Sequence, residues 1–284
     1  MKVSVPGYAK INLFLDIRSL RENGYHNILS IMQRIGLHDT ITVTYSKDST
    51  KSISLSCDRS DIPCDSKNLA YRAADIYPIS GKLDIHIEKH IPMSAGLAGG
   101  SADAAATLIA LNLIAEKPLS TEELCTLGAK LGADVPFCIK GGACLVEGIG
   151  EIMTPIAPMP NLPLVIAKMG EGMSTPAAYR ALDIKFNNFV SYPTHSHQCQ
   201  TVLDANDATT LCEGLFNVFE EVVEPDRPCV TEIKKTMLSK GAVGAMMSGS
   251  GTSVFGIFQT EAEAHDAKKA LSELGAEAFV CYPA

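Results

Sequence analysis

The chain has 284 residues, of which 46% are hydrophobic and 20% are charged, and its formal net charge is −8. This composition is typical of a soluble protein with a substantial core, and the acidic balance argues against a general affinity for nucleic acid or anionic membranes. The sequence contains no apolar run of about 18 residues, which a transmembrane helix would need. Its first residues lack the apolar core of a signal peptide. We therefore expect a cytoplasmic protein.

Nine cysteines are scattered along the chain without a Cys-x-x-Cys pair. Their odd number and the expected reducing compartment predict buried free thiols rather than disulfides or zinc ligands. His86 and His90 are four residues apart, a spacing that suits a metal on a helix, but they lie in a strand-like segment that ends at Pro92. A metal site at these two histidines is therefore disfavoured, and the sequence leaves any metal ligands unassigned.

The first half of the chain alternates strand and helix patterns. Alternating or β-branched segments predict strands at residues 3–5, 11–17, 40–45, 52–56, 83–88 and 142–147. Helices are expected over residues 68–77, 102–115 and 120–131. Ser120 followed by Glu123 predicts a capping box at the start of the third helix, and Gly132 follows its end.

The second half is expected to mix helices with an antiparallel sheet. The proline-rich segment Pro155–Pro163 marks the predicted boundary, which gives domains over residues 1–155 and 156–284. Residues 185–205 are polar and predict an exposed irregular connection, in which His195 and His197 would be loop residues. Strands are expected at 164–167, 243–247, 253–258 and 278–282, and helices at 207–221, 227–239 and 261–274. The resulting fold class is α+β.

A glycine loop connects the strand at 83–88 to an alanine-rich helix. It consists of Pro92, Met93, Ser94, Ala95, Gly96, Leu97, Ala98, Gly99, Gly100, Ser101 and Ala102. Glycines let a backbone approach an anion closely, and the unpaired N–H groups of a helix start point at it. The loop lacks the Lys of a G-x-x-x-x-G-K-[ST] motif and is not a G-x-G-x-x-G fingerprint. It predicts an ATP-binding or other phosphate-binding site, and the alternative is a glycine-rich connection into a buried helix.

Two charged residues stand in apolar surroundings. Lys10 lies at the start of an apolar strand, where it either reaches out to water at a sheet edge or points into a cleft and pairs with a phosphate. Asp134 precedes Val-Pro-Phe, where it either bonds its own backbone in a turn or serves as a half-buried general base. A nearby lysine would keep such a base ionised.

A second glycine loop, Ser248–Thr252, contains Gly249, Ser250 and Gly251 between two predicted strands. Small residues at this place form either a tight hairpin or a backbone segment that closes over phosphates. The loop, the two charged residues and the first glycine loop are each modest signals. Their occurrence together over most of the chain is far more specific.

The sequence resembles the GHMP kinases, small-molecule kinases named for galactose, homoserine, mevalonate and phosphomevalonate. Pro92–Ala102 matches their phosphate loop, and Gly249–Gly251 matches their C-terminal glycine motif. Further matches point to the branch that acts on a cytidylyl sugar alcohol. They are Ala9–Leu15, Gly24–His26, Leu131–Phe137 and Glu147–Glu151. The resemblance spans about residues 6 to 258.

The resemblance implies a phosphoryl transfer from ATP, with Mg²⁺, to the 2-hydroxyl of 4-diphosphocytidyl-2-C-methyl-D-erythritol. The products would be the 2-phosphate and ADP, in the non-mevalonate isoprenoid precursor pathway. It also implies a two-domain fold, with an N-terminal ATP-binding domain, a C-terminal antiparallel-sheet domain and the active cleft between them. The expected partner is this small molecule, and no protein partner is evident.

The same resemblance implies roles for individual residues. Asp134 would take the hydroxyl proton as base, and Lys10 would orient and polarise that hydroxyl. Asn12 would lie near the substrate. Tyr25 would stack on the cytosine, and His26 would hydrogen bond to it.

The sequence departs from the family pattern at three places. Ala98 stands where most members have glycine, and an alanine cannot adopt a positive φ cheaply. Phosphate binding should survive if Ala98 has an ordinary backbone conformation. Asp103 replaces a common Asn; it either faces Mg²⁺ or caps its own helix while turned away, and we favour the cap. Met32 lies where an aromatic that packs on cytosine is common.

The sequence motifs leave three alternative functions to be weighed. The chain could be a homoserine or mevalonate kinase of the same family, against which Gly24–His26 and the Gly-Ala-Asp-Val-Pro segment argue. It could be a non-catalytic sugar- or nucleotide-binding regulator, but such a protein should have lost Lys10 or Asp134. It could be a structural protein without a small-molecule site, which four matched motifs disfavour.

Overall fold

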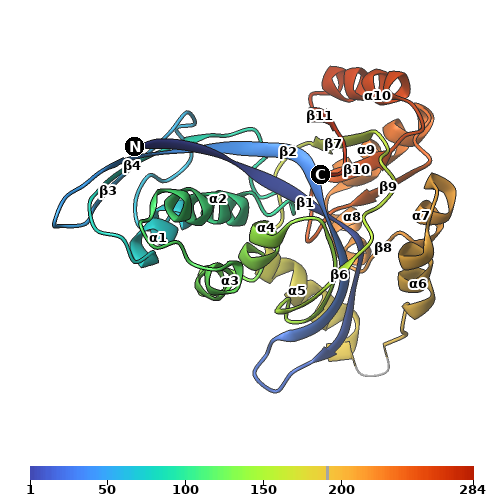
Figure 1. Ribbon diagram of the computed structural model, residues 1–284. Coiled ribbons are helices and arrows are strands. Elements are labelled where there is room, and N and C mark those ends of the chain that lie inside the picture. Colours follow the sequence, from blue (N-terminus) through green and yellow to red (C-terminus); the bar gives the residue numbers. More distant parts are fainter. Residues whose placement is uncertain (190–191) are drawn as a thin grey trace. The chain divides into compact units, whose positions relative to one another are not determined.

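The computed structural model describes residues 1–189 and 192–284 (Figure 1). The chain forms two compact units, each of which contains both helices and strands. Unit 1 comprises Met1–Ala9, His38–Ile91 and Ala98–Gly141, and unit 2 comprises Lys10–Leu37, Pro92–Leu97 and Gly142–Ala284. The α+β class is confirmed, and the domain boundary at residues 155 and 156 stays a prediction.

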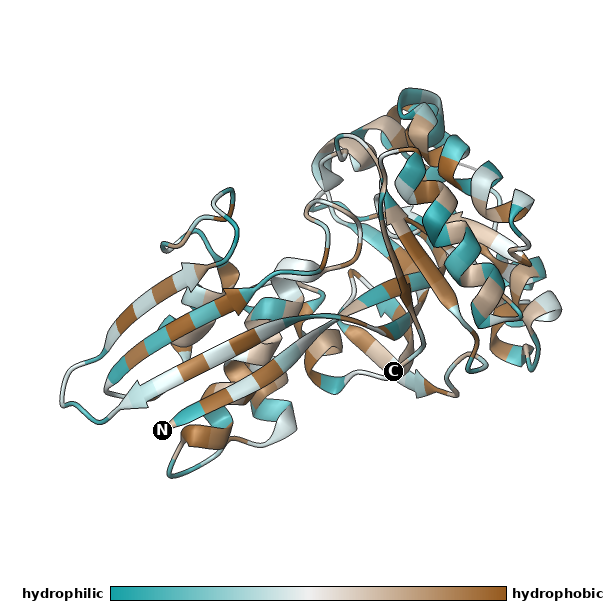
Figure 2. Ribbon diagram, turned by 90° about the horizontal axis from the view of Figure 1, so that it is seen from above, coloured by the Kyte–Doolittle hydropathy of each residue, from teal (hydrophilic) through white to brown (hydrophobic). Residues whose placement is uncertain are grey.

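Two long strands, β1 (Lys2–Leu20) and β2 (His26–Ser46), run through both units. They are much longer than the short segments expected from the sequence. In unit 1, β2 pairs antiparallel with β4 (Lys82–Glu88), and β4 pairs parallel with β3 (Ser52–Cys57). Figure 2 shows hydrophobic and hydrophilic residues alternating along these strands, as a sheet with one buried face requires.

Four helices complete unit 1: α1 (Leu69–Ile76), α2 (Gly99–Ile114), α3 (Thr121–Ala129) and α4 (Val135–Lys140). Helices α1 and α2 pack against each other and on one face of the sheet (Figure 1). The core that they share with the sheet contains many small side chains. It includes Ala70, Ala73, Ala74, Ala104, Ala105, Leu108, Ile41, Val43, Leu83, Ile85 and Ile87. The predicted capping box of Ser120 and Glu123 is present at the start of α3.

Gly7 in β1 lies unusually close to the first turn of α2. A Cβ at Gly7 would stand 2.8 Å from Ala102 O and 3.0 Å from Ala102 C. Both are backbone atoms of a helix and cannot move aside cheaply. Strand β1 therefore fixes the position of the α2 start within unit 1.

The antiparallel sheet expected in the second half is present in unit 2. Its strand order is β11 (Glu277–Cys281), β7 (Leu164–Lys168), β10 (Val254–Ile257) and β9 (Gly244–Met247), and all its pairings are antiparallel. Helices α9 (Pro228–Ser239) and α10 (Glu261–Glu273) contact each other and β7. They therefore cover one face of this sheet.

Three further strands of unit 2 extend β1 and β2. Strand β5 (Ala143–Gly148) pairs antiparallel with β2 and with β6 (Ile152–Ile156). The two-residue strand β8 (Phe216–Asn217) pairs parallel with β1 at Phe14 and Leu15. Both β6 and β8 were absent from the sequence-based expectation.

The expected irregular connection at 185–205 is wrong in part. Helix α5 (Thr175–Lys185) and the 3₁₀ turn Asn187–Phe189 lead to α6 (Ser196–Asp204), whose Cys199 and Val202 are buried one turn apart. His197 therefore lies in a helix, and residues 190–191 lie outside the described part. Polar residues between the two buried positions hid this short amphipathic pattern.

The single helix expected over 207–221 is also wrong. The structure has α7 (Ala208–Gly214), then β8, then α8 (Glu220–Asp226). Gly214 packs so closely on α6 that a Cβ there would stand 2.8 Å from Gln198 O. Pairing with β1 then holds Phe216 and Asn217 in an extended conformation, which helix periodicity could not reveal.

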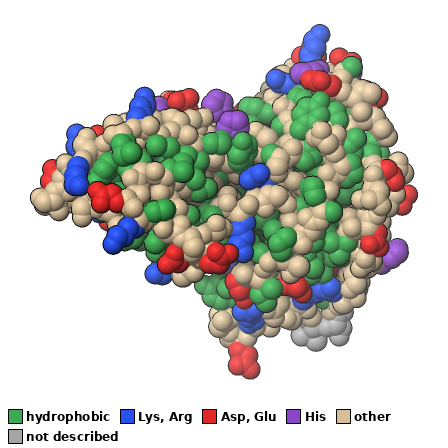
Figure 3. Space-filling view, viewed as in Figure 1, with side chains coloured by type: hydrophobic (Ala, Val, Ile, Leu, Met, Phe, Trp, Pro, Cys, Tyr) green, Lys and Arg blue, Asp and Glu red, His purple; other side chains and the backbone are tan. Residues whose placement is uncertain are grey.

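All nine cysteines are free thiols, as expected, but only Cys144, Cys199 and Cys281 are buried, whereas Cys64 is exposed and the other five are half-buried. Within residues 1–189 and 192–284, no helix has the length and apolar character needed to cross a bilayer. On the face drawn in Figure 3, Lys and Arg side chains are interspersed with Asp and Glu.

The close contact at Gly7 generates a stability prediction. Gly7→Ala should lower the free energy of unfolding by about 1–3 kcal/mol, because the added methyl group overlaps the α2 backbone. Chemical denaturation followed by circular dichroism measures this change.

Gly100→Ala in α2 is the matched control. Its added Cβ would lie 3.6 Å from Leu69 Cδ1, an ordinary contact, and alanine favours a helix over glycine by about 1 kcal/mol. The control should be as stable as the wild type or more stable. Equal stability of Gly7→Ala and Gly100→Ala would contradict the packing argument.

Candidate functional site

The part Pro92–Ala98 of the first glycine loop leads directly into α2, which begins at Gly99 rather than at the expected residue 102. Ser94, Gly96 and Ala98 have φ values of +48°, +72° and +59°. Ala98 therefore does not have the ordinary conformation under which phosphate binding was expected to survive. An alanine in the left-handed region costs about 1–2 kcal/mol, so the surrounding loop must stabilise this conformation.

The start of α2 presents unpaired backbone donors. Ala102 N donates to Ala98 O at 2.9 Å, whereas the N–H groups of Gly99, Gly100 and Ser101 precede the first possible helical partners. The helix also directs the positive end of its dipole to this place. The chemistry suits an anionic phosphate group.

The second glycine loop, Ser248–Thr252, connects β9 to β10 and contacts the first loop within unit 2. A Cβ at Gly96 would overlap Ser248 O, and one at Gly249 would stand 2.8 Å from Gly96 O. Ser248 Oγ donates to Gly96 O at 3.1 Å, and Ser253 N donates to Ala95 O at 3.3 Å. The two loops therefore meet backbone to backbone, which requires glycine at these positions.

Lys10 is buried in β1 and points at the same carbonyl. Its Nζ donates to Gly96 O at 2.9 Å and to Asn12 Oδ1 at 2.6 Å, and its exposed fraction is 4%. Asn12 Nδ2 in turn donates to Ser30 Oγ at 2.8 Å. The alternative of an edge lysine that reaches out to water is therefore wrong. The structure brings together Lys10, Asn12 and both glycine loops.

Asp134 belongs to unit 1, where it immediately precedes α4. The turn before it is closed by Val135 N, which donates to Gly132 O at 3.2 Å. The Asp134 side chain is half-buried and makes no cap hydrogen bond to α4. At the start of α4 the structure therefore shows no bond of the kind that the alternative of a turn aspartate bonding its own backbone requires.

His26, the first residue of β2, is buried in an aromatic cluster of unit 2. Its ring stacks on Tyr179 at 4.6 Å between centroids and meets the edge of Phe189 at 5.7 Å. His26 Nε2 bonds Asp183 Oδ1 at 2.6 Å. Tyr179 and Asp183 lie one turn apart on α5, so both face His26. Neither residue was expected at the site, because no sequence pattern connects α5 to β2.

Tyr25 precedes His26 and is 60% exposed. It follows a turn in which Gly24 has φ +81° and Tyr25 N donates to Asn23 Oδ1 at 3.2 Å. An exposed aromatic ring held by a defined turn is a suitable platform for stacking on a planar group. Met32, which stands where an aromatic that packs on cytosine is common, is itself buried in β2.

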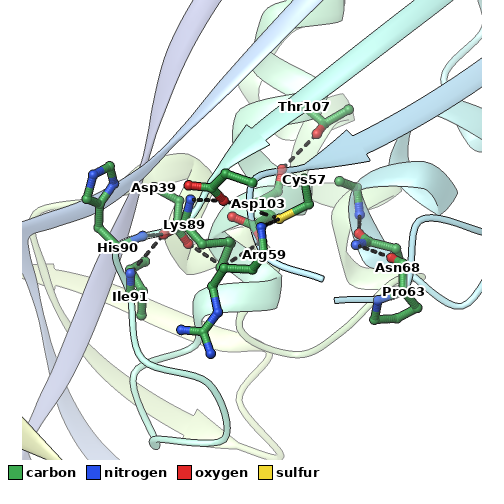
Figure 4. Close-up of polar contacts among 12 residues, drawn as sticks. Asp39, Cys57, Arg59, Pro63, Asn68, Lys89, His90, Ile91, Asp103 and Thr107 are labelled. Atoms are coloured by element: carbon green, nitrogen blue, oxygen red, sulfur yellow. Dashed lines mark hydrogen bonds and ion pairs between the residues drawn. The ribbon is translucent and has the colours of Figure 1, made fainter. Parts of the chain in front are cut away.

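Asp103 forms part of a buried charge cluster in unit 1 (Figure 4). Lys89 Nζ donates to Asp103 Oδ2 at 2.8 Å and also bonds Asp39 Oδ2. Asp39 Oδ1 accepts the backbone N–H groups of His90 at 2.6 Å and Ile91 at 2.8 Å. The cluster therefore connects the chain before the first glycine loop to α2 after it.

The expectation that Asp103 caps α2 is wrong. The residue lies in the second turn, beyond the orphan N–H groups, and the α2 start has no side-chain cap. Burial, opposed by the charge of Lys89 and reinforced by that of Asp39, raises the pKa of Asp103 to about 7. Lys89 is also buried, but the charges of Asp103 and Asp39 outweigh this desolvation and raise its pKa.

A protein-held metal does not fit the described residues. No group of three or more His, Cys, Asp or Glu side chains in this part of the chain could hold one. Asp103 Oδ1 is buried without a hydrogen-bond partner, but the same carboxylate already carries the Lys89 ammonium. His86 Nδ1 bonds Ser56 Oγ at 2.9 Å. We therefore derive no chemical step through a metal that side chains hold.

Comparison with known proteins gives consistent matches along the chain. The model of the GHMP kinases N terminal domain matches residues 68–142, and that of the GHMP kinases C terminal domain matches residues 200–277. A 4-diphosphocytidyl-2-C-methyl-D-erythritol kinase of Alkaliphilus metalliredigens is 45% identical over 277 residues, which cover 96% of this chain and 94% of the relative. A kinase of the same name from Clostridium novyi is 45% identical over 88% of this chain and 89% of its own length.

Solved structures agree with these matches. A crystal structure of 4-(cytidine 5'-diphospho)-2C-methyl-D-erythritol kinase aligns with a TM-score of 0.79 and 31% identity, covering 100% of this chain and 99% of the other. The mevalonate kinase of Methanococcus jannaschii aligns with a TM-score of 0.77 but only 16% identity, covering 100% of this chain and 98% of the other. At this low identity, the similarity to the mevalonate kinase supports a shared fold alone.

The raised pKa of Asp103 predicts a pH-dependent stability. Because about 7 lies above the ordinary value of 3.8, the folded state holds a proton that the unfolded chain releases. This contribution is complete below about pH 4 and is lost as the pH rises to 7, with a slope of at most about 1.4 kcal/mol per pH unit. Asp103→Asn should remove the slope while still accepting from Lys89.

Denaturant unfolding of both proteins at pH 5, 6, 7 and 8 measures this difference. The variant should gain stability relative to the wild type as the pH rises. Asp61→Asn, at an exposed residue paired with Arg59, is the control and should show no such gain above pH 5. A constant difference between Asp103→Asn and the wild type at every pH would contradict the assignment.

Proposed function

The chain belongs to the GHMP kinases, and from this premise we propose that it phosphorylates 4-diphosphocytidyl-2-C-methyl-D-erythritol on its 2-hydroxyl. As a member it is a small-molecule kinase that uses ATP, and the products would be the 2-phosphate and ADP. The identity of 45% to relatives named for this substrate, over nearly the whole chain, supports the choice of acceptor. The reaction would serve the non-mevalonate isoprenoid precursor pathway.

The observation that carries the proposal of phosphoryl transfer is the Lys10 contact. A buried ammonium group bonds the carbonyl of Gly96, inside the loop that leads to the α2 start. Phosphoryl transfer needs positioning and charge neutralisation more than covalent chemistry. The unpaired N–H groups of Gly99, Gly100 and Ser101 would supply donors to the phosphates of ATP. We propose that Mg²⁺ enters with the nucleotide and neutralises part of its charge.

Lys10 and Asp134 are the proposed catalytic residues. Asp134 would accept the proton of the 2-hydroxyl as the new P–O bond forms, and the oxygen would attack the γ-phosphorus while ADP leaves. Lys10 would orient and polarise that hydroxyl. Asn12 Oδ1 accepts from Lys10 Nζ at 2.6 Å, and this hydrogen bond would keep the ammonium group oriented toward the 2-hydroxyl.

Tyr25 and His26 are the proposed contacts to the cytosine. The exposed Tyr25 ring would stack on the base, and the buried His26 would hydrogen bond to its edge. Because Asp183 accepts from Nε2 of His26 when that nitrogen carries a proton, Nδ1 of the neutral ring would be an acceptor. An acceptor at this place suits the exocyclic amino group that distinguishes cytosine from uracil.

The release of ADP from ATP and Mg²⁺ tests the proposed function. We would compare 4-diphosphocytidyl-2-C-methyl-D-erythritol with homoserine and mevalonate as acceptors. Turnover confined to the cytidylyl substrate is the expected result. Turnover of another alcohol would overturn the choice of acceptor, and ATP binding without any turnover would favour a non-catalytic regulator.

Asp134→Asn should reduce kcat by roughly 10²–10⁴-fold, the usual contribution of a general base. The amide has the shape of the carboxylate but cannot accept the proton, so affinity for ATP should remain within about twofold. Steady-state kinetics and nucleotide titration measure the two quantities. A kcat close to that of the wild type would remove Asp134 from the role of base.

Tyr25→Ala should raise KM for the cytidylyl substrate by roughly tenfold or more, since stacking on a base contributes about 1–3 kcal/mol. KM for ATP should not change. The side chain is mostly exposed, so the substitution should not affect folding. Tyr25→Phe keeps the ring and is the matched control, with a KM near the wild-type value. If both variants bind the substrate like the wild type, Tyr25 is not part of the site.

A further inference from the structure

Asn217, in β8, uses its whole side-chain amide on the backbone around the second glycine loop. Its Nδ2 donates to Met247 O and to Gly249 O, both at 2.8 Å, and its Oδ1 accepts from Phe219 N at 3.0 Å. The residue is 3% exposed. Two donors and one acceptor on one short side chain are a combination that only an amide supplies at this size.

Glu220, three residues later in the chain, binds the backbone N–H of Met247, the last residue of β9. Its Oε1 accepts from Met247 N at 2.8 Å and from Lys234 Nζ at 2.8 Å. The N–H and the C=O of Met247 are therefore both bound by side chains of the segment Asn217–Glu220. Strand β8 contacts β9 (Figure 1), so this segment determines where the second glycine loop begins.

The second glycine loop connects Asn217 to Lys10 through Gly96. Ser248 directly follows Met247, and its hydroxyl and backbone meet Gly96. The Gly96 carbonyl is the acceptor for Lys10 Nζ. Strand β8 also pairs with β1, the strand that carries Lys10, at Phe14 and Leu15. All these residues belong to unit 2.

We propose that Asn217 is a positioning residue for phosphoryl transfer, which holds the second glycine loop against Gly96 and thereby directs Lys10. The proposal rests on the role given to Lys10 in the proposed function. Asn217 binds the carbonyls of Met247 and Gly249 at the second glycine loop. This loop meets Gly96, whose carbonyl accepts from the Lys10 ammonium group. In this proposal Asn217 itself does not contact the substrate. Its loss therefore changes the chemical step rather than the recognition of cytosine.

Asn217→Asp tests the proposal, because it keeps the shape of the side chain but places carboxylate oxygens against the carbonyls of Met247 and Gly249. We expect kcat to fall by at least about tenfold, equivalent to about 1.4 kcal/mol in the barrier. KM for the cytidylyl substrate should stay within about twofold. The measurement is made at a temperature at which denaturation shows both proteins to be fully folded.

Asn112→Asp is the matched control. Asn112 is an asparagine of α2 that also bridges backbone groups, since Nδ2 donates to Leu119 O at 2.9 Å and Oδ1 accepts from Leu119 N at 2.6 Å. It touches neither glycine loop in these contacts. This variant should lose stability but retain the wild-type kcat, which separates positioning from folding.

A pH profile adds a signature that a purely structural role would not give. Protonation of the introduced carboxyl restores one donor, and burial beside two carbonyls raises its pKa. The kcat of Asn217→Asp relative to the wild type should therefore recover as the pH falls from 8 to 6. A kcat of folded Asn217→Asp within twofold of Asn112→Asp at every pH would overturn the proposal.

Failure of the proposed function would be visible separately. If the wild type does not turn over the cytidylyl substrate, the choice of acceptor fails, and titration with a non-hydrolysable ATP analogue still tests Asn217. The displaced second loop should then weaken analogue binding by at least about tenfold in Asn217→Asp but not in Asn112→Asp. Equal affinities of the two variants would overturn the role of Asn217.

Discussion

The contact between Gly96 and Ser248 is the constraint on which the site in unit 2 depends. The two backbones meet where a Cβ on Gly96 would overlap Ser248 O, and Gly96 has φ +72°. Only glycine satisfies both conditions without strain. The Gly96 carbonyl accepts from Ser248 Oγ and from Lys10 Nζ. Lys10 Nζ donates to two neutral acceptors, Gly96 O and Asn12 Oδ1, and these two contacts do not cancel its positive charge.

The Asp39–Lys89–Asp103 cluster serves a corresponding purpose in unit 1. Buried ion pairs are weak evidence for stability, because desolvation offsets much of their attraction. This cluster contains two carboxylates and one ammonium group. Burial, opposed by the charge of Lys89 and reinforced by that of Asp39, raises the pKa of Asp103 to about 7. The value of the cluster to the fold is geometric. It binds the N–H groups of His90 and Ile91 and the second turn of α2, and so holds both flanks of the first glycine loop.

Local sequence signals predicted the elements that depend on neighbouring residues. The capping box of Ser120 and Glu123, the strand at 83–88 and the phosphate-loop motif each follow from a short pattern with a direct physical cause. Contacts between distant residues were not predictable in this way. Asp39 lies 50 residues from Lys89, and Asn217 lies 30 residues from Met247. The positive φ of Ala98 also escaped prediction, because tertiary contacts rather than its own preference impose it. The proposed roles of Asp134, Tyr25 and His26 came from resemblance to a family.

The central claim is that the Gly96 carbonyl joins the two glycine loops to Lys10 while the α2 start receives the phosphates. A crystal structure of the wild-type protein with a non-hydrolysable ATP analogue and the cytidylyl substrate tests it most directly. We expect the Lys10 Nζ to Gly96 O hydrogen bond to persist, with phosphate oxygens within hydrogen-bonding distance of the N–H groups of Gly99, Gly100 and Ser101. A Lys10 ammonium turned away from Gly96, or phosphates bound away from the α2 start, would contradict it.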